Sequence, residues 1–166
     1  MTLPDLAPDT VQATLDALAN GEECPVCDGE GGVKKSGGLK KCSCCNGTGR
    51  TAPDLRMIDA LVCRELGYEL YPYPSSGLGC YLLGSQELKR IPAYCTDWGA
   101  GGPLLEEACR SSGAMIVHTQ QLPHNTRIDI EWPDWDEPLT VWNDESELVA
   151  RVCAWLMWRV RTGAEA

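Results

Sequence analysis

Two copies of one short motif constrain this chain more than any other feature. Residues 24–31 read CPVCDGEG and residues 42–49 read CSCCNGTG, so both fit the pattern C-x-x-C-x-G-x-G. A C-x-x-C pair places two thiolates on one tight turn, and two such turns supply the four sulfurs of a closed tetrahedral zinc site. The glycines let the chain curl back with its amides toward sulfur, through conformations that cost least for glycine. Four protein ligands leave no open position for water or substrate, so the motif predicts a structural metal and no reaction.

The repeats resemble the cysteine-rich zinc finger of the DnaJ-type chaperones. That family carries four repeats and two zinc ions, whereas this chain has two repeats, which is enough for one zinc ion per chain. The resemblance implies that the zinc ligands are Cys24, Cys27, Cys42 and Cys45. Cys44 is an additional thiol in the second repeat and could compete with its neighbours. Single-zinc versions of the finger occur in small proteins that bind other proteins, so the resemblance implies an adaptor. No J-domain signature supports a co-chaperone role.

A disulfide or a redox site would be the alternative for the paired cysteines. The sequence begins MTLPDLAPDT, which has neither the basic nor the apolar region of a signal peptide. No apolar run approaches the roughly 18 residues of a membrane span. We therefore expect a cytoplasmic, reduced protein outside the membrane, in which this spacing indicates metal. A thioredoxin-like C-x-x-C needs a helix after it, whereas Gly-rich loops follow both motifs here, so redox catalysis is the weaker interpretation.

The net charge of −10 is unevenly distributed. Residues 1–20 carry −3, residues 21–50 carry +1 and residues 51–166 carry −8. Eight acidic side chains and no Lys or Arg lie from 129 to 147, and we expect all eight to project outward. Nucleic-acid phosphates would repel such a chain, so no direct nucleic-acid binding is expected. The segment is interpreted as a solvated acidic face. The alternative is a surface for a basic partner, in which a Pro-flanked turn displays Asp134, Asp136 and Glu137.

The chain divides by pattern into an N-terminal helix (1–21), a zinc-binding module (22–50) and an α+β body (51–166). Helical spacing of apolar residues predicts helices over residues 10–19, 53–66, 103–111 and 145–161. Strands are predicted over residues 68–73, 79–83, 115–120, 127–132 and 139–142. Most connections between the strands are short, which predicts an α+β fold with one mainly antiparallel sheet, packed helices and a small zinc-binding hairpin module. The expected helix caps are Asp9 or Thr10, Thr96 or Asp97, and Asp144.

Segments of the body resemble the phage alpha-beta-alpha sandwich domain, found in small accessory proteins of tailed phages and prophages. Residues 57–67 (MIDALVCRELG) resemble its opening helix, and residues 92–97 (PAYCTD) resemble its Pro-x-Tyr-Ser-Thr-Asp segment. Cys95 stands where serine is usual, and residues 98–103 replace a regular Ala-rich helix start, so the middle helix is expected to begin later. The family has no established catalytic activity, so the resemblance implies a phage-type context and no reaction.

Sequence motifs for catalysis are absent: there is no P-loop, G-x-S-x-G, H-E-x-x-H or dinucleotide fingerprint. Cys95 precedes a helix start, where a lowered pKa could make its thiol a nucleophile, with His118 or His124 as base. This thiol enzyme ranks last of three hypotheses. The leading one is a phage- or prophage-type accessory protein, not an enzyme, that binds a protein partner such as a host factor through the zinc module. The second is an acidic nucleic-acid mimic that inhibits a host nuclease or defence complex.

Overall fold

The computed structural model describes residues 3–35, 37–73, 77–81, 89–122, 125–133, 135–143 and 146–163. Within them the chain forms four helices and three antiparallel sheets. The helices are α1 (Val11–Asn20), α2 (Leu55–Glu65), α3 (Trp98–Ser112) and α4 (Glu147–Thr162). The strands are β1 (Gly32–Lys35), β2 (Gly38–Lys41), β3 (Glu69–Tyr73), β4 (Gly77–Tyr81), β5 (Lys89–Arg90), β6 (Met115–Leu122), β7 (Asn125–Glu131) and β8 (Leu139–Asn143). The predicted α+β class is confirmed.

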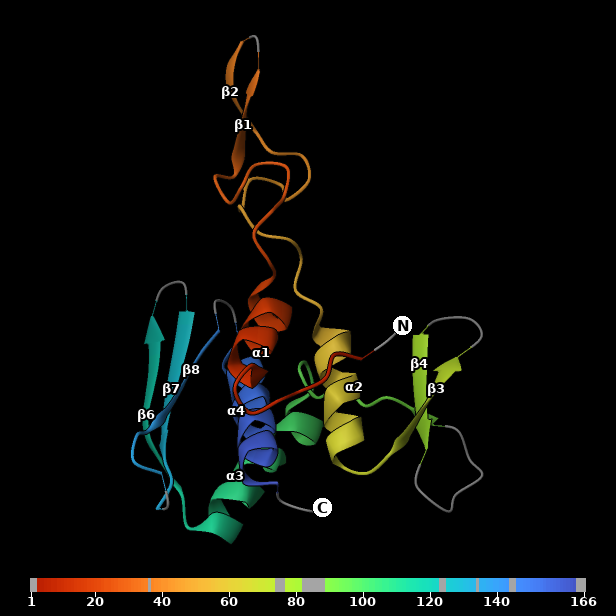
Figure 1. Ribbon diagram of the computed structural model, residues 1–166, viewed down its shortest axis with the longest axis vertical. Coiled ribbons are helices and arrows are strands. Elements are labelled where there is room, and N and C mark those ends of the chain that lie inside the picture. Colours follow the sequence, from red (N-terminus) through yellow and green to blue (C-terminus); the bar gives the residue numbers. More distant parts are fainter. Residues whose placement is uncertain are drawn as a thin grey trace.

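Helix α4 lies at the centre of the body (Figure 1). It packs against the other three helices and against β7 and β8. All side chains from Leu148 to Met157 except Arg151 are buried. A helix that is apolar on nearly all sides is stable only when other elements surround it. Helix α4 is therefore the element on which the layers of the body pack.

Two separate three-stranded sheets flank the helices, where the sequence predicts one sheet (Figure 1). In the first, the order is β6-β7-β8, and the second has the order β3-β4-β5. Side chains alternate along β7, so Ile128 and Ile130 share its inner face, where they join the core beside Leu139 and Val141 of β8. The two-residue strand β5 is too short to leave a periodic signal and was not predicted from the sequence.

Helices α1 and α2 pack against each other and against α4. Three α1 side chains are buried in the core that α2 and α4 share, namely Val11, Leu15 and Ala19. The carboxylate of Asp54 caps α2 by accepting from the Met57 amide (3.1 Å). The amide of Asp54 in turn donates to the Leu18 carbonyl (2.8 Å). The end of α1 and the start of α2 are thus joined where the cysteine-rich segment leaves the body.

Helix α3 begins five residues before its predicted start at 103, at Trp98. Asp97 caps it, as one of the two predicted caps, by accepting from the Gly99 amide (2.8 Å). The sequence WGAGGP suggests a helix breaker, but the glycines serve close packing. A Cβ on Gly101 would lie 2.1 Å from the Tyr94 carbonyl oxygen. Tertiary contact therefore decides this helix start, and the expectation that it begins later is wrong.

Two other predicted caps differ from the structure. Helix α4 begins at Glu147 rather than at 145, and its cap is Ser146, whose hydroxyl accepts from the Val149 amide (3.3 Å). Asp144, the predicted cap, lies outside the described residues. Thr10 occupies the N-cap position of α1 without a side-chain cap bond. Its hydroxyl donates instead to the Ala7 carbonyl (3.4 Å). A nearby backbone carbonyl thus competes with the helix amides for this hydroxyl.

Candidate metal centre

The two repeats form equivalent turns that exchange backbone hydrogen bonds. The amide of Cys24 donates to the Gly49 carbonyl (2.8 Å), and the amide of Cys42, its equivalent in the second repeat, donates to the Gly31 carbonyl (2.8 Å). Gly31 and Gly49 are the last residues of their repeats. The first residue of each turn is therefore hydrogen-bonded to the last residue of the other turn, and this reciprocal pairing brings the four paired cysteines together.

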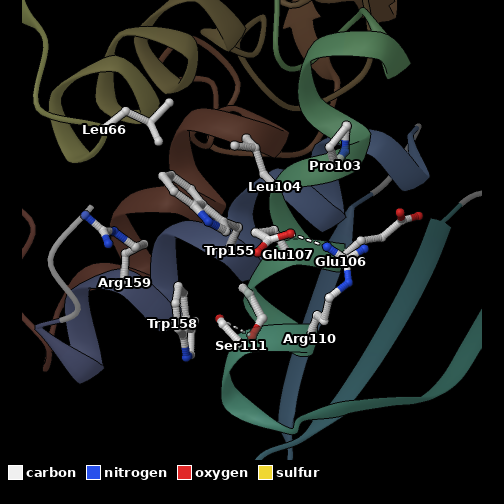
Figure 2. A pocket seen from close by; sticks show the side chains of 11 residues that line it. Leu66, Pro103, Leu104, Glu106, Glu107, Arg110, Ser111, Trp155, Trp158 and Arg159 are labelled. Atoms are coloured by element: carbon white, nitrogen blue, oxygen red, sulfur yellow. Dashed lines mark hydrogen bonds and ion pairs between the residues drawn. The ribbon is translucent and has the colours of Figure 1, made fainter.

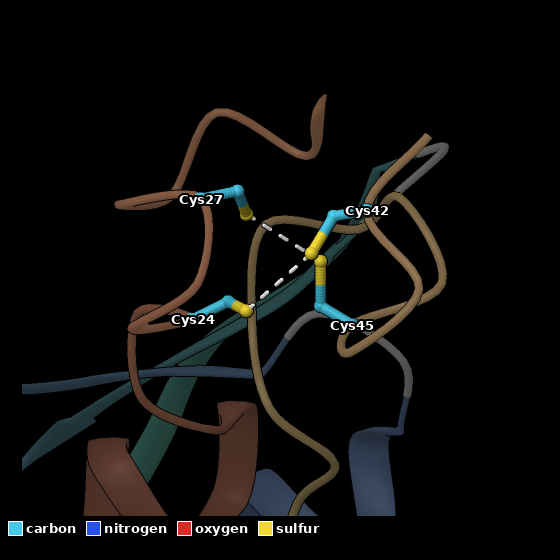
Figure 3. A group of neighbouring side chains, drawn as sticks. All are labelled: Cys24, Cys27, Cys42 and Cys45. Carbon is cyan, nitrogen blue, oxygen red and sulfur yellow. Dashed lines mark hydrogen bonds between the residues drawn. The ribbon is translucent and has the colours of Figure 1, made fainter. Parts of the chain in front are cut away.

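The four sulfurs point at one another in the buried centre of this module (Figure 3). The Sγ atoms of Cys24 and Cys42 are 3.9 Å apart, and those of Cys27 and Cys45 are 3.7 Å apart. All four sulfurs lie within 4.8 Å of one another. A tetrahedral ion with metal–sulfur bonds of about 2.3 Å requires sulfurs about 3.8 Å apart. This four-cysteine group, predicted from the repeats, can hold a metal ion.

Left-handed backbone conformations shape both turns. The φ angles of Gly31 and Gly49 are +71° and +83°, and a Cβ on Gly31 would lie 2.5 Å from the Gly47 carbonyl oxygen. Asp28 and Asn46, which follow the second cysteine of each repeat, also have positive φ angles of 47° and 51°. Asp and Asn tolerate this region better than most residues. The motif thus encodes its turns through residues that can adopt left-handed conformations.

Hydrogen-bond donors around the sulfurs favour thiolate at part of the site. Burial raises the pKa of the Cys45 thiol, but the Gly49 amide (N to Sγ 3.3 Å) and the Cys27 thiol outweigh it and lower the pKa to about 6. Burial and the Cys45 sulfur raise the pKa of Cys27 to about 12. Four sulfurs this close repel each other when all are charged, and a bound cation removes that conflict.

The additional thiol of the second repeat lies outside the four-sulfur group. Cys44 is exposed, whereas Cys42 and Cys45 are buried. The converging sulfurs of this repeat are those of the C-x-x-C pair, Cys42 and Cys45, and not those of the adjacent cysteines Cys44 and Cys45. This follows from the tight turn, which directs its first and fourth residues to the same side.

The β1–β2 hairpin forms the tip of the molecule furthest from the body (Figure 1). Its strands pair from Gly32 with Lys41 to Lys35 with Gly38. Val33 packs against the cysteine cluster. Leu39 instead is 70% exposed. The hairpin therefore packs on the sulfur centre through Val33 and presents the apolar side chain of Leu39 to solvent.

Paired backbone connects this module to the body. Glu23 and Arg50 form an antiparallel bridge. The Thr51 amide donates to the Glu22 carbonyl (2.8 Å), and the Glu22 amide donates to the Thr51 hydroxyl (3.0 Å). Arg50 Nη1 also donates to the Gly21 carbonyl (3.2 Å). The module is thus attached through two paired backbone segments, one leading from α1 and one leading to α2.

Asp129 is not part of an exposed acidic face, and its predicted outward projection into solvent is wrong. The residue is only 7% exposed. Its carboxylate accepts from Arg127 Nε (2.9 Å) and from the Thr140 hydroxyl (2.7 Å). Thr140 is the cross-strand partner of Asp129 on β8, so neighbouring side chains on the same sheet face cover the carboxylate.

The rest of the acidic segment is described in part. Glu131, Asp136 and Glu137 are exposed, as predicted, whereas Glu147 is half-buried and its carboxylate accepts from Arg151 Nε (2.9 Å). Asp134, the third predicted partner-binding residue, lies outside the described residues, as do Asp144 and Glu145. The exposed carboxylates near the end of β7 therefore include two of the three residues that the sequence assigns to a partner surface.

Cys95 lies in the core and not at an accessible helix mouth. Its amide donates to the buried carboxylate of Asp59 (2.9 Å). Burial and the negative charge of Asp59 raise the pKa of the Cys95 thiol far above its ordinary value, so the predicted lowering of this pKa is wrong. Of the two candidate bases, His118 lies on β6 with its side chain outside the described part, and His124 lies wholly outside it.

Known proteins offer no direct guide to function. Comparison of the chain with models of protein families, with curated proteins and with solved structures found no match. Among the described residues, no helix combines the length and apolar character needed to cross a membrane.

Proposed function

We propose that this chain is an accessory protein that binds a protein partner through a module stabilised by one Zn²⁺ ion on Cys24, Cys27, Cys42 and Cys45. The observation that supports this most is a buried four-sulfur centre beneath an exposed hairpin that projects from the body (Figure 1). Four thiolates in tetrahedral geometry favour zinc. Because protein sulfur fills every position, the ion holds the fold of the module and performs no chemistry.

One face of the β1–β2 hairpin is the proposed contact surface. Leu39 and Lys34 are cross-strand partners, and Lys41 pairs with Gly32 two residues away, so these three side chains share one face. Leu39 is exposed, as are both lysines. Burial of one leucine stabilises a complex by about 1.5–3 kcal/mol. The partner surface that fits this face has an apolar depression with carboxylates at its rim.

The two sequence resemblances supply the proposed context. A single-zinc version of the DnaJ-type finger suggests an adaptor, and the likeness of the body to the phage alpha-beta-alpha sandwich domain suggests a phage or prophage protein. We therefore place the chain in the host cytoplasm with a host factor as its partner. It has no catalytic role in this proposal.

Affinity capture with two matched variants tests the proposal. Leu39→Ser and Met115→Ser each remove one exposed apolar side chain, at 70% and 63% exposure, from the hairpin and from the body respectively. Zinc-loaded wild type and both variants are used to capture proteins from a lysate of host cells. Wild type and Met115→Ser should retain one partner that Leu39→Ser loses at least about tenfold. Equal retention by all three proteins would refute this hairpin face as the binding surface.

An acidic mimic is the second candidate, and exposed charges near the end of β7 favour it. Asp136 and Glu137 are exposed, and neither takes part in the ion pairs found within the described residues. A partner held by these charges should be released in 1 M salt, where the screening length is about 3 Å. It should also be lost when Asp134, Asp136 and Glu137 are all changed to Ser. Unaltered capture by that triple variant would discard the mimic.

A further inference from the structure

A groove on the body lies far from the zinc module, between α3 and α4 and beside the end of α2 (Figure 2). Its volume is about 560 Å³, within the roughly 300–1,000 Å³ typical of small-molecule sites. The apolar part of its wall consists of Leu66, Pro103, Leu104, Ala108, Trp155 and Trp158. Two indole rings on successive turns of α4 give this groove a surface on which an aromatic or aliphatic body can pack.

A buried guanidinium group borders the groove. Arg159 is only 8% exposed. Its Nη2 donates to the carbonyl of Glu65 at the end of α2 (2.6 Å), and its Cζ lies 5.7 Å from the centre of the Trp155 ring. Within the part of the chain that the structure describes, its buried Nε–H has no acceptor. A buried polar group without a partner costs about 1–3 kcal/mol, and more when the group is charged.

Arg159 also lacks a counter-ion in the described part of the chain, where none of the ion pairs includes it. The carboxylate of Glu65 belongs to the same residue as the bound carbonyl, but it accepts from Arg64 Nε (3.1 Å). Arg110, the other cation of the groove, is exposed and paired with Glu107. The groove thus holds one surface cation in an ion pair and one buried cation for which the described residues provide no ion pair. Buried charges in proteins are normally paired.

We propose that this groove binds a small carboxylate with an apolar body, which packs on Trp155 and Trp158 while its carboxylate neutralises Arg159. A concave site of this volume suits a small molecule. A guanidinium group matches the planar geometry of a carboxylate. The exposed carboxylates of Glu106 and Glu107 also line the groove, and they disfavour a ligand with several negative charges. The site therefore selects a single anionic charge at one end of an apolar molecule.

Two probes of equal shape test the role of the charge. The zinc-loaded full chain is titrated with 2-naphthoate and with the neutral 2-naphthamide, and the indole N–H signals of the six tryptophans are followed by NMR, with Trp155→Phe and Trp158→Phe used for assignment. The signals of Trp155 and Trp158 should shift with 2-naphthoate, with an affinity at least about tenfold higher than for the amide. Equal affinity for both probes, or no shift of these signals, would overturn the proposal.

Two arginine variants separate a local from a general charge effect. Arg159→Met should abolish the preference for 2-naphthoate over the amide. Arg161→Met removes the same charge two residues along α4, where the side chain is exposed and stacks on Trp135, and it should keep the preference. Loss of the preference in both variants would overturn the assignment to Arg159.

A blocking variant tests the groove without removing a core contact. Ser111 is exposed and lines the groove, so Ser111→Phe adds bulk there and leaves Arg159 in place. It should weaken 2-naphthoate binding at least about tenfold while the melting temperature stays within a few degrees of wild type. If Arg159→Met fails to fold, the Ser111→Phe variant still tests whether the ligand binds in the groove. Unchanged binding by a folded Ser111→Phe protein would place the ligand elsewhere and overturn the proposal.

Discussion

A Cβ on Gly49 would lie 2.2 Å from the carbonyl oxygen of Gly29, and the φ angle of Gly49 is +83°. The two glycines belong to different repeats, so this approach is one of the points at which the two cysteine turns pack. Gly49 also accepts the amide hydrogen of Cys24 through its carbonyl. Any side chain at position 49 therefore separates the turns that bring the sulfurs together.

Gly49→Ala should weaken zinc binding about tenfold or more, because the left-handed conformation costs alanine roughly 1–2 kcal/mol even before the steric clash. Competition with a chelator of known zinc affinity measures the change. Gly37→Ala is the matched control, since among the described residues a Cβ there meets no atom within 4 Å apart from its chain neighbours, and its zinc affinity should equal that of wild type. Equal affinity of Gly49→Ala and Gly37→Ala would contradict the packing described for the two turns.

Metal analysis of freshly purified, reduced protein should find one zinc ion per chain. Cys24→Ser and Cys45→Ser should each lose it, because each removes one of the four converging sulfurs. Cys44→Ser should retain it, since that thiol is exposed outside the group. A protein without zinc would sink the assignment, and two ions per chain would reveal a second site.

Removal of zinc should unfold residues 22–50 and leave the body folded. The four cysteines form a buried cluster separate from the main hydrophobic core, and a structural ion stabilises the module that it closes. Amide hydrogen exchange with and without chelator locates the change, with protection lost in β1 and β2 and kept in α4. Loss of all cooperative unfolding on chelation would mean that the two parts fold as one unit.

Asp59→Asn should change how stability depends on pH. Burial raises the pKa of Asp59 above its ordinary value of 3.8, and the bonds from Cys95 and Arg56 offset this only in part. The unfolded chain releases this proton at lower pH than the folded chain. The stability that Asp59 contributes is therefore complete below pH 3.8 and is lost as the pH rises through the folded pKa. Urea unfolding at several pH values should show the free energy of unfolding of Asp59→Asn rising relative to wild type over that range. Parallel profiles would contradict the raised pKa.

The chain should not bind DNA or RNA at physiological salt. Its net charge is −10, and the exposed lysines of the β1–β2 hairpin are too few to offset repulsion by the acidic body. Fluorescence anisotropy with labelled single-stranded and double-stranded probes measures this. Salt-sensitive binding that disappears in a Lys34→Ser, Lys41→Ser variant would show instead that the hairpin contacts phosphates.

The sequence by itself determined the features that depend on neighbours within a few residues. The C-x-x-C-x-G-x-G spacing predicts which four cysteines converge, because a tight turn fixes the direction of its own side chains. Helical spacing predicts α1 and α2 to within two residues at each end, and Asp97, one of the two caps predicted for α3, caps that helix. Alternation in β7 predicts that Ile128 and Ile130 enter the core.

Tertiary structure alone decided what distant segments do to each residue. The burial of Asp129 needs Thr140 on the next strand, and the raised pKa of Cys95 needs burial in the core and the negative charge of Asp59 on α2. The early start of α3 needs the close approach of Tyr94 to Gly101. The groove beside Arg159 exists only because α2, α3 and α4 meet there. Such effects depend on the exclusion of solvent and on charges that are close in space. Local sequence patterns do not indicate which side chains from distant segments come that close.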